Sequence, residues 1–426
     1  MTLLFVMGYY TGIGQNISVP GTDFSNAKAV FSELKECLKN DGGKLWNHKL
    51  DGPVMLVNRE TRALIANQPD GKGELVKMGS FYIGTFPENL NISNSAFNWN
   101  GIRWTVVALP LPDTKYGRIN LLVHELFHRI QPMIGFGSLS EIQCTHLDSK
   151  EGRICLKLEL EALKAALKSD HPEQHLRDAL LFRQYRRQLF PEAKIAENSL
   201  ELYEGVAEYT GAILSGRNKT ELQEHLVSEI DQFFGVPSFV RSFAYITVPV
   251  YGYFMQQADG KWNLKINNNT DLTSFINTFF KTGPSEPGKK EIQRLGKSYG
   301  IKTITAFEEK REITRLEQKK TYRARFLGNN ALVIGLEDIR IGFYPGNLFP
   351  LDSLGTVYPN LRITDNWGIL EVDSCGALIS KDWQHVTIGP PLVVSDTMVS
   401  GNGWKLKLNS RWKVEKEAGK YKLITR

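Results

Sequence analysis

The spacing of apolar residues changes twice along this chain, and each change predicts a different kind of structure. Near the N-terminus, apolar residues recur at helical spacing over Asp23–Asp41. Runs rich in β-branched and aromatic residues follow and favour strands: Gly52–Asp70 as two strands joined by a polar turn, then Gly79–Pro87 and Gly101–Pro112. We therefore expect residues 16–115 to form one helix and an antiparallel sheet.

From Tyr116 onward the pattern becomes helical. Helical periodicity with capping and breaking residues predicts a series of helices, at Tyr116–Ile130, Ile154–Ser169, Pro172–Phe190, Ala193–Ser215, Thr220–Phe234 and Asp271–Thr282. The segment Phe243–Gln257 is ambiguous, because it is rich in aromatic and β-branched residues and contains a proline. We interpret residues 116–285 as one helical region.

The last third of the chain has a different texture. Residues 286–321 read as a helical linker that starts in the Pro- and Gly-rich stretch Lys281–Lys290. From residue 322, apolar and polar residues alternate with period two, and turn signals separate the runs. The sequence thus predicts an α+β fold in which a small all-β domain, residues 322–426, follows the helical region.

Length and charge narrow the classes of function. A chain of 426 residues is too long for one ordinary core, so we expect two or three domains. The formal charge is +6, and the densest basic run, Gly288–Lys302, with Glu308–Lys320 close behind it, is interleaved with glutamates. Stacking aromatics do not alternate with its cations, which favours a solvated helical face over a nucleic-acid patch. We expect no nucleic-acid partner.

The N-terminal residues bear on localisation. The apolar run Leu3–Met7 is far shorter than the about 20 residues that cross a bilayer. Residues 1–15 resemble the later half of a secretory signal peptide, and the alternative is a short buried strand. We expect a signal-peptide remnant, no transmembrane segment, and a secreted or periplasmic protein.

The four cysteines do not suggest a thiolate metal site. They form no CxxC pair, which such sites commonly use. Cys144 and Cys155 are either a disulfide in an oxidising compartment or separate buried thiols, and both readings stay open.

One short segment, INLLVHELFHRIQP (Ile119–Pro132), carries the strongest chemical signal. His124 and His128 are four residues apart and share one face of a helix, while Glu125 lies about 100° round from His124. Two imidazoles can bind a divalent ion, with a carboxylate beside them to take a proton from water. Zinc suits such ligands best. The alternative is an ordinary amphipathic helix, but its apolar residues would bury both histidines, and buried imidazoles need partners.

A zinc site of this kind needs a third protein ligand, and a later helix offers glutamates. Asn198–Gly211 contains Glu201, Glu204 and Glu208, of which the last two share a face. These carboxylates lie among apolar residues, where an unpaired charge is costly. His146 is an alternative ligand or a loop residue.

HExxH followed by a helix with EGxA resembles the gluzincin metallopeptidases, over roughly Gly101–Gln257. The chain also resembles uncharacterised secreted bacterial proteins with HELFHRIQ and EGxAEY. The resemblance implies a zincin-like N-terminal sheet with a helical catalytic region, and Glu204 as the third zinc ligand. It also implies a tyrosine that stabilises the oxyanion. Among the tyrosines that follow the Glu204 helix, we select Tyr245.

The function expected from this resemblance is that of a zinc-dependent metallohydrolase. We expect a peptidase that cleaves amide bonds of a peptide or protein substrate, with Glu125 as general base. Glu208 either orients a ligand histidine or lies on the helix surface. One alternative is a catalytically inactive zinc-binding protein that binds peptide or glycan. Another is a structural secreted protein with an accidental HExxH.

Overall fold

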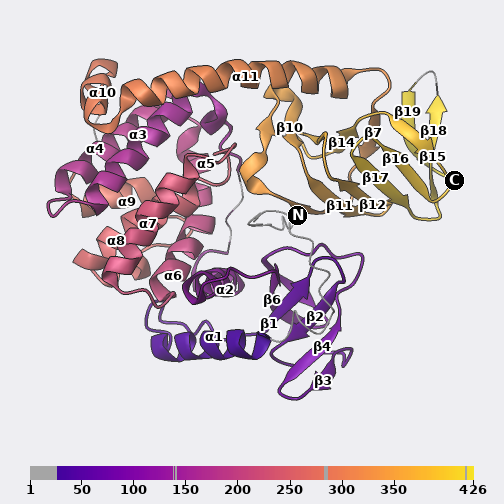
Figure 1. The fold of residues 1–426 in the computed structure, drawn as a ribbon, viewed down its shortest axis with the longest axis horizontal. Helices are drawn as coiled ribbons and strands as arrows, with labels where there is room; N and C mark the ends of the chain where they lie inside the picture. Colours follow the sequence, from indigo (N-terminus) through magenta and orange to yellow (C-terminus); the bar gives the residue numbers. More distant parts are fainter. Residues whose placement is uncertain (1–25, 138, 140–141, 283–285, 418–419) are drawn as a thin grey trace. The chain divides into compact units, whose positions relative to one another are not determined.

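The computed structural model describes residues 26–137, 139, 142–282, 286–417 and 420–426 (Figure 1). The chain is mixed α+β with three sheets and an all-β C-terminal region, as the sequence predicts at this coarse level. The described residues form two compact units. We call residues 26–85 with Ser95–Glu309 the helical unit, and Phe86–Asn94 with Lys310–Arg426 the β unit. The expected signal-peptide remnant, residues 1–15, lies outside the described residues.

The helical unit contains one six-stranded sheet with the order β3-β4-β2-β1-β6-β5. Its strands are β1 Val54–Asn58, β2 Ala63–Ala66, β3 Val76–Met78, β4 Phe81–Thr85, β5 Ser95–Trp99 and β6 Ile102–Leu109. The polar turn between β1 and β2 forms where the sequence predicts it, and Asn58 Oδ1 accepts hydrogen bonds from the backbone N–H groups of Glu60 and Thr61.

The expectation of an antiparallel sheet was wrong at its centre. β1 and β6 pair in parallel, with Leu56 opposite Val107, while the other neighbouring pairs are antiparallel. Both central strands are nearly continuous apolar runs, which is typical of parallel strands covered on both faces. The chain passes through β2 to β5 between these two strands and then returns in the same direction. A local sequence pattern does not predict this connection.

One helix of this unit precedes the sheet in the chain, and the others follow it. They are α1 Ala27–Asp41, α2 Lys115–Ile130, α3 Lys150–Leu167, α4 Glu173–Leu189, α5 Ala193–Leu200, α6 Val206–Leu214, α7 Lys219–Phe233, α8 Ala244–Ala258, α9 Leu272–Phe279 and α10 Lys289–Gly296. A short π-helix, η3 (Glu201–Gly205), joins α5 to α6. The ambiguous segment is the helix α8, even though it contains Pro249.

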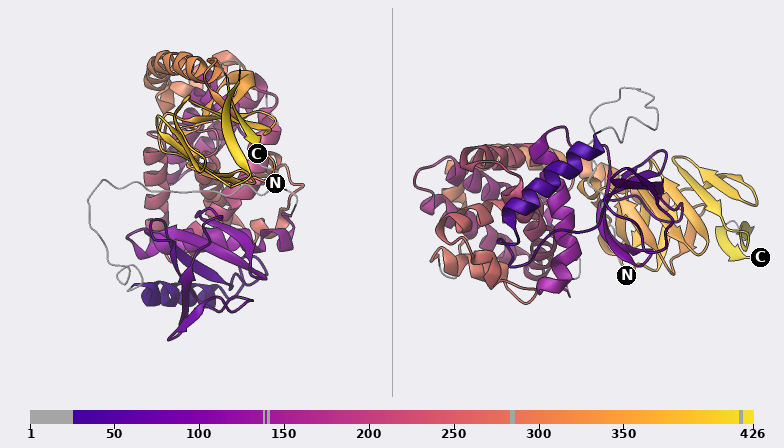
Figure 2. Two further views of the ribbon diagram at one scale, coloured as in Figure 1. Left: turned by 90° about the vertical axis from the view of Figure 1, so that its right-hand side faces the viewer. Right: turned by 90° about the horizontal axis from the view of Figure 1, so that it is seen from below.

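Helix α2 lies at the centre of the unit. It contacts β5 and β6 on one side and α6 on another, and α1 packs against it as well. α1 also reaches the sheet, where Phe31 stacks on Phe81, and it lies beside the sheet in both views of Figure 2. The residues of α2 therefore face protein on most sides, which explains why nearly all of its second half is buried.

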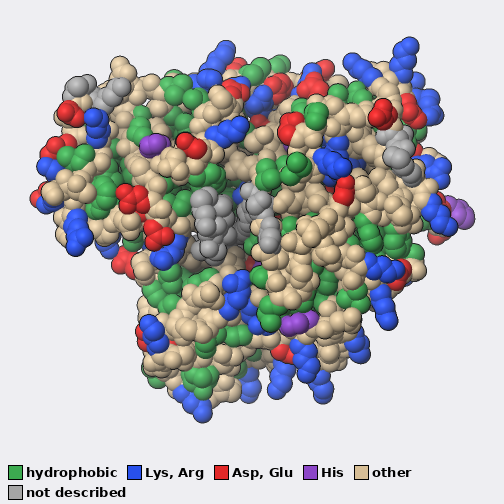
Figure 3. All heavy atoms as spheres, turned by 180° about the vertical axis from the view of Figure 1, so that it is seen from behind, with side chains coloured by type: hydrophobic (Ala, Val, Ile, Leu, Met, Phe, Trp, Pro, Cys, Tyr) green, Lys and Arg blue, Asp and Glu red, His purple; other side chains and the backbone are tan. Residues whose placement is uncertain are grey.

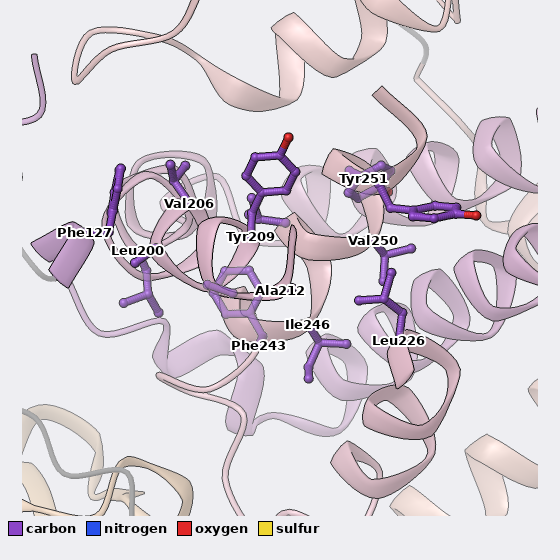
Figure 4. Packing of buried hydrophobic residues seen from close by; sticks show 14 of the residues in the cluster. Phe127, Leu200, Val206, Tyr209, Ala212, Leu226, Phe243, Ile246, Val250 and Tyr251 are labelled. Carbon is purple, nitrogen blue, oxygen red and sulfur yellow. The ribbon is translucent and has the colours of Figure 1, made fainter. Parts of the chain in front are cut away.

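The helices share one apolar core. Figure 4 shows part of it, with labelled side chains that come from α2 (Phe127), α5 (Leu200), α6 (Val206, Tyr209, Ala212), α7 (Leu226) and α8 (Ile246, Val250, Tyr251). Close approach requires glycine at two points. A Cβ at Gly211 would lie 2.4 Å from the carbonyl oxygen of Asn120, and a Cβ at Gly252 would lie 2.4 Å from the ring of Tyr209. These contacts hold α6 between α2 and α8.

The β unit is built from two sheets. Their orders are β18-β19-β7-β14-β13-β10-β9 and β15-β16-β17-β12-β11-β8. The strands are β7 Leu332–Gly335, β8 Arg340–Phe343, β9 Phe349–Pro350, β10 Gly355–Tyr358, β11 Leu361–Asp365, β12 Gly368–Val372, β13 Ala377–Ser380, β14 His385–Ile388, β15 Pro391–Val394, β16 Met398–Gly401, β17 Trp404–Leu408, β18 Trp412–Glu417 and β19 Lys420–Thr425. One apolar core takes side chains from both sheets, so the predicted period-two alternation reflects inward and outward faces.

Two further segments complete the chain. Helix α11 (Ile301–Leu327) extends beyond the residue at which the sequence pattern places the start of the β domain. Phe86–Asn94 belongs to the β unit because Asn91 donates to the carbonyl of Arg340 and accepts from the Arg362 guanidinium.

The described helices include none with the length and apolar composition needed to cross a membrane. Lysine and arginine side chains are spread among acidic ones over the face drawn in Figure 3. The four cysteines are free thiols.

Candidate metal centre

Helix α2 carries the HExxH residues. It begins after Thr114, whose side-chain oxygen accepts from the Gly117 N–H and so caps the first turn. His124, Glu125 and His128 lie near its other end, and each is less than a tenth exposed. The expected partner for the buried imidazoles lies on the π-helix directly before α6, the helix that α2 contacts.

That partner, Glu204, lies on the π-helix η3. The Val206 N–H bonds to the Glu201 carbonyl, five residues back, so the turn is one residue wider than an α-helical turn. Gly205 allows this turn to approach α8, because a Cβ there would lie 2.4 Å from Val248 Cγ2. Single π-turns occur frequently at functional sites. Here the wide turn carries a fully buried carboxylate toward α2.

Three side-chain atoms converge on one point. The Nε2 atoms of His124 and His128 are 3.0 Å apart, and each lies 3.4 Å from Glu204 Oε2. Ligands about 2.0–2.2 Å from a tetrahedral ion stand about 3.4 Å from one another. The buried group His124, His128 and Glu204 can therefore hold a metal ion.

Unpaired oxygens near this point fit the same interpretation. Glu204 Oε1 and Glu125 Oε2 are buried without a hydrogen-bond partner. Buried carboxylate oxygens without a donor are costly. A cation and its water would satisfy them, so the residues present fit a metal ion.

Each of the two histidines also makes a hydrogen bond at its other ring nitrogen, Nδ1, which orients the ring. His124 Nδ1 lies 2.8 Å from Glu208 Oε2, and Glu208 also accepts from Asn120. His128 Nδ1 lies 2.8 Å from Gln131 Oε1. With both Nδ1 atoms donating, both Nε2 atoms can turn a lone pair toward the shared point, which is the tautomer that a metal ligand needs.

Tyrosines lie against both imidazoles. The Tyr245 hydroxyl donates to Glu204 Oε2 over 2.6 Å, and the Tyr245 ring stacks on His124 with the centroids 5.6 Å apart. Tyr203 lies against His128, with the centroids 4.8 Å apart. The other two tyrosines of α8 bond elsewhere, Tyr251 to Glu159 and Tyr253 to Gln223. Among the three, the structure brings Tyr245 to the candidate centre.

The electrostatics of the centre favour a positive charge at its middle. Burial lowers the pKa of His124, but its bonds to Glu204 and Glu208 outweigh burial and hold this pKa well above the usual value. Burial raises the pKa of Glu204, yet the two histidines hold it below its usual value. Burial raises the pKa of Glu125 to about 7, against the opposing effect of His124 and His128. A carboxylate that titrates near neutrality suits a general base.

A second buried polar cluster includes Glu201, the first residue of η3. We call it the arginine–glutamate cluster. It joins Arg183, Arg186 and Arg187 of α4 to Glu159, Glu197 and Glu201. His146, considered above as an alternative ligand, bonds to Glu197 in this cluster and is not one of the three residues that converge.

Two residues that contact the candidate ligands, Gln131 and Asn120, were not predicted from the sequence. A local signal existed for Gln131, because it follows His128 by three residues and so lies on the same helical face. Asn120 precedes His124 by four residues, and the same spacing applies.

Comparisons with protein-family models, curated proteins and solved structures found no match.

Proposed function

We propose that this protein is a zinc-dependent metallohydrolase, and specifically a peptidase of the gluzincin type. The observation that carries the proposal is the convergence of His124 Nε2, His128 Nε2 and Glu204 Oε2 beside Glu125, which has a buried oxygen without a donor. Imidazole and carboxylate donors at these separations suit zinc. An HExxH helix packed between a sheet and the helix of the third ligand supports a zincin-like catalytic region.

When bound, zinc would supply Lewis acidity, which polarises a carbonyl and lowers the pKa of water. The residues of the chain would perform the other tasks. Glu125 would accept a proton from the attacking water at a carboxylate oxygen and would deliver it to the leaving amine. The Tyr245 hydroxyl would donate to the developing oxyanion. Glu208 would keep the Nδ1 proton of His124 in place.

The place of action that we propose is outside the cytoplasm, as a secreted or periplasmic enzyme. This part of the proposal depends on the resemblance of residues 1–15 to a signal peptide. The substrate would be a peptide or protein.

The test compares wild type with Glu125→Gln and with a matched carboxyl-to-amide control, Glu229→Gln. Glu229 is partly buried on α7, and burial raises its pKa to about 7, so an amide resembles its protonated form. Elemental analysis should find about one zinc per chain in all three proteins. Cleavage of a peptide library, followed by mass spectrometry, should fall by about 10²–10⁴ in Glu125→Gln only.

Two results would contradict the proposal. Absence of zinc from wild type after dialysis against zinc would remove the metal site. Zinc and peptide binding without cleavage would favour the alternative function, an inactive zinc-binding protein that binds peptide or glycan.

A further inference from the structure

Gln131 makes three hydrogen bonds in the interior of the helical unit. It follows the last residue of α2 and is 1% exposed. Its Oε1 accepts from His128 Nδ1 over 2.8 Å, and its Nε2 donates to the carbonyls of Leu202 and Tyr203 over 3.1 and 2.9 Å. The two donor contacts also settle which end of the amide is oxygen.

The two carbonyls belong to the π-helix η3. A wider turn displaces the regular helical bonds, and buried carbonyls require donors. The Tyr203 carbonyl is part of the peptide bond that precedes Glu204. One carboxamide therefore joins the imidazole of one candidate ligand to the backbone of another, across two helices that are more than 70 residues apart in sequence.

The neutral amide also suits the charge of the centre. Three carboxylates, Glu125, Glu204 and Glu208, already surround the two histidines. Glu208 orients His124 with a negative charge, whereas Gln131 orients His128 without adding a fourth. A carboxylate at position 131 could accept from His128 but could not donate to the two carbonyls.

We propose that Gln131 is the positioning residue that sets the distance between His128 and Glu204, so that both can bind one metal ion. This inference rests on the proposed function. It predicts that metal affinity depends on both the oxygen and the nitrogen of the Gln131 amide. Residues that support metal ligands typically contribute 10–100-fold to metal affinity.

The experiment measures zinc affinity by competition with a chromophoric chelator, for wild type, Gln131→Met and Gln131→Asn. The methionine keeps the length of the side chain but loses its polar atoms, and the asparagine keeps the amide on a shorter stem. Gln184→Met is the matched control, because Gln184 is a partly buried glutamine bonded to Asn277. Visible spectra with cobalt(II) report ligand geometry, and thermal unfolding of the metal-free proteins reports structure alone.

We expect the zinc dissociation constant of Gln131→Met to rise about 10–100-fold and its cobalt spectrum to change. Gln131→Asn should change the zinc dissociation constant and the cobalt spectrum in the same direction but by less. Gln184→Met should match wild type. If Gln131→Met does not fold, the asparagine variant decides. Wild-type affinity and spectrum in the folded Gln131 variants, even with lower melting temperatures, would overturn the inference. A wild type that binds zinc but cleaves no peptide would reject the peptidase and leave this test valid, whereas a wild type that binds no zinc would overturn both.

Discussion

The arginine–glutamate cluster and the metal centre are both buried, both ionisable and both attached to the Glu201–Gly205 turn, yet they are satisfied in opposite ways. In the cluster, every carboxylate oxygen of Glu159, Glu197 and Glu201 accepts at least one hydrogen bond. In the metal centre, one oxygen of Glu125 and one of Glu204 accept none. In the cluster all carboxylate oxygens are satisfied within the protein, although Arg187 Nη2 makes no hydrogen bond, and such carboxylates have a structural task. Carboxylates with unpaired oxygens, as in the candidate metal centre, are suited to bind a cation.

Three predictions can sharpen or break this comparison. The largest effect should come from breaking the arginine–glutamate cluster. Arg186 is fully buried and bonds to both Glu159 and Glu197, so Arg186→Ala removes a charged donor from each of these buried carboxylates. We expect a loss of about 3–5 kcal/mol in the free energy of unfolding, measured by denaturant titration with and without zinc.

The same titration on Lys115→Ala provides the control, because Lys115 forms an exposed ion pair with Glu36. That variant should unfold like wild type. A zinc-dependent loss in Arg186→Ala would contradict the separation between the two clusters.

The second effect concerns the stability that zinc should add at the candidate metal centre. Zinc at a concentration of 1,000 times its dissociation constant should stabilise wild type by about 4 kcal/mol. Glu204→Ala should lose this zinc-dependent gain, because it removes the third ligand. Unfolding at several zinc concentrations measures the gain. An undiminished gain in Glu204→Ala would show that zinc binds elsewhere.

The smallest effect concerns a partly buried histidine that stays neutral in the folded protein, His225. His225 lies on α7 with Nδ1 3.6 Å from Glu229, and burial lowers its pKa to about 4, with Arg217 acting in the same direction and Glu208 opposing it. Between pH 6.5 and 4 the unfolded chain binds this proton and the folded chain does not, so the contribution of His225 to stability falls as the pH falls through this window. Glu229, whose pKa burial raises, contributes in the opposite direction and is present in both wild type and the variant.

His225→Gln should remove that pH dependence. We expect wild type to lose about 1–3 kcal/mol relative to the variant between pH 7 and pH 4, measured by chemical unfolding across this range. Parallel stability curves for the two proteins would contradict the buried neutral state of His225.

Local pattern accounts for a definite part of the candidate site. His124 and His128 share one helical face with Glu125 beside it, and the spacing of these residues suffices to predict this. Glu204 came from the resemblance to gluzincins, and the structure places it beside both histidines. The roles assigned to these residues, to Tyr245 and to Glu208 remain predictions, and the experiments above test those of Glu125 and Glu204.

The sequence by itself determined the elements whose signal lies within one turn or one strand. These are the helix of the HExxH residues, the polar turn after β1 and the alternation of the β unit. Only the tertiary structure decided the parallel pairing of β1 with β6, the helical state of α8 around Pro249, and the approach of Gln131 to the Glu204 turn. The reason is that hydrophobic periodicity reports which side of an element is buried, whereas partners distant in sequence are selected by packing. A buried polar group then binds whichever donor or acceptor that packing brings within reach.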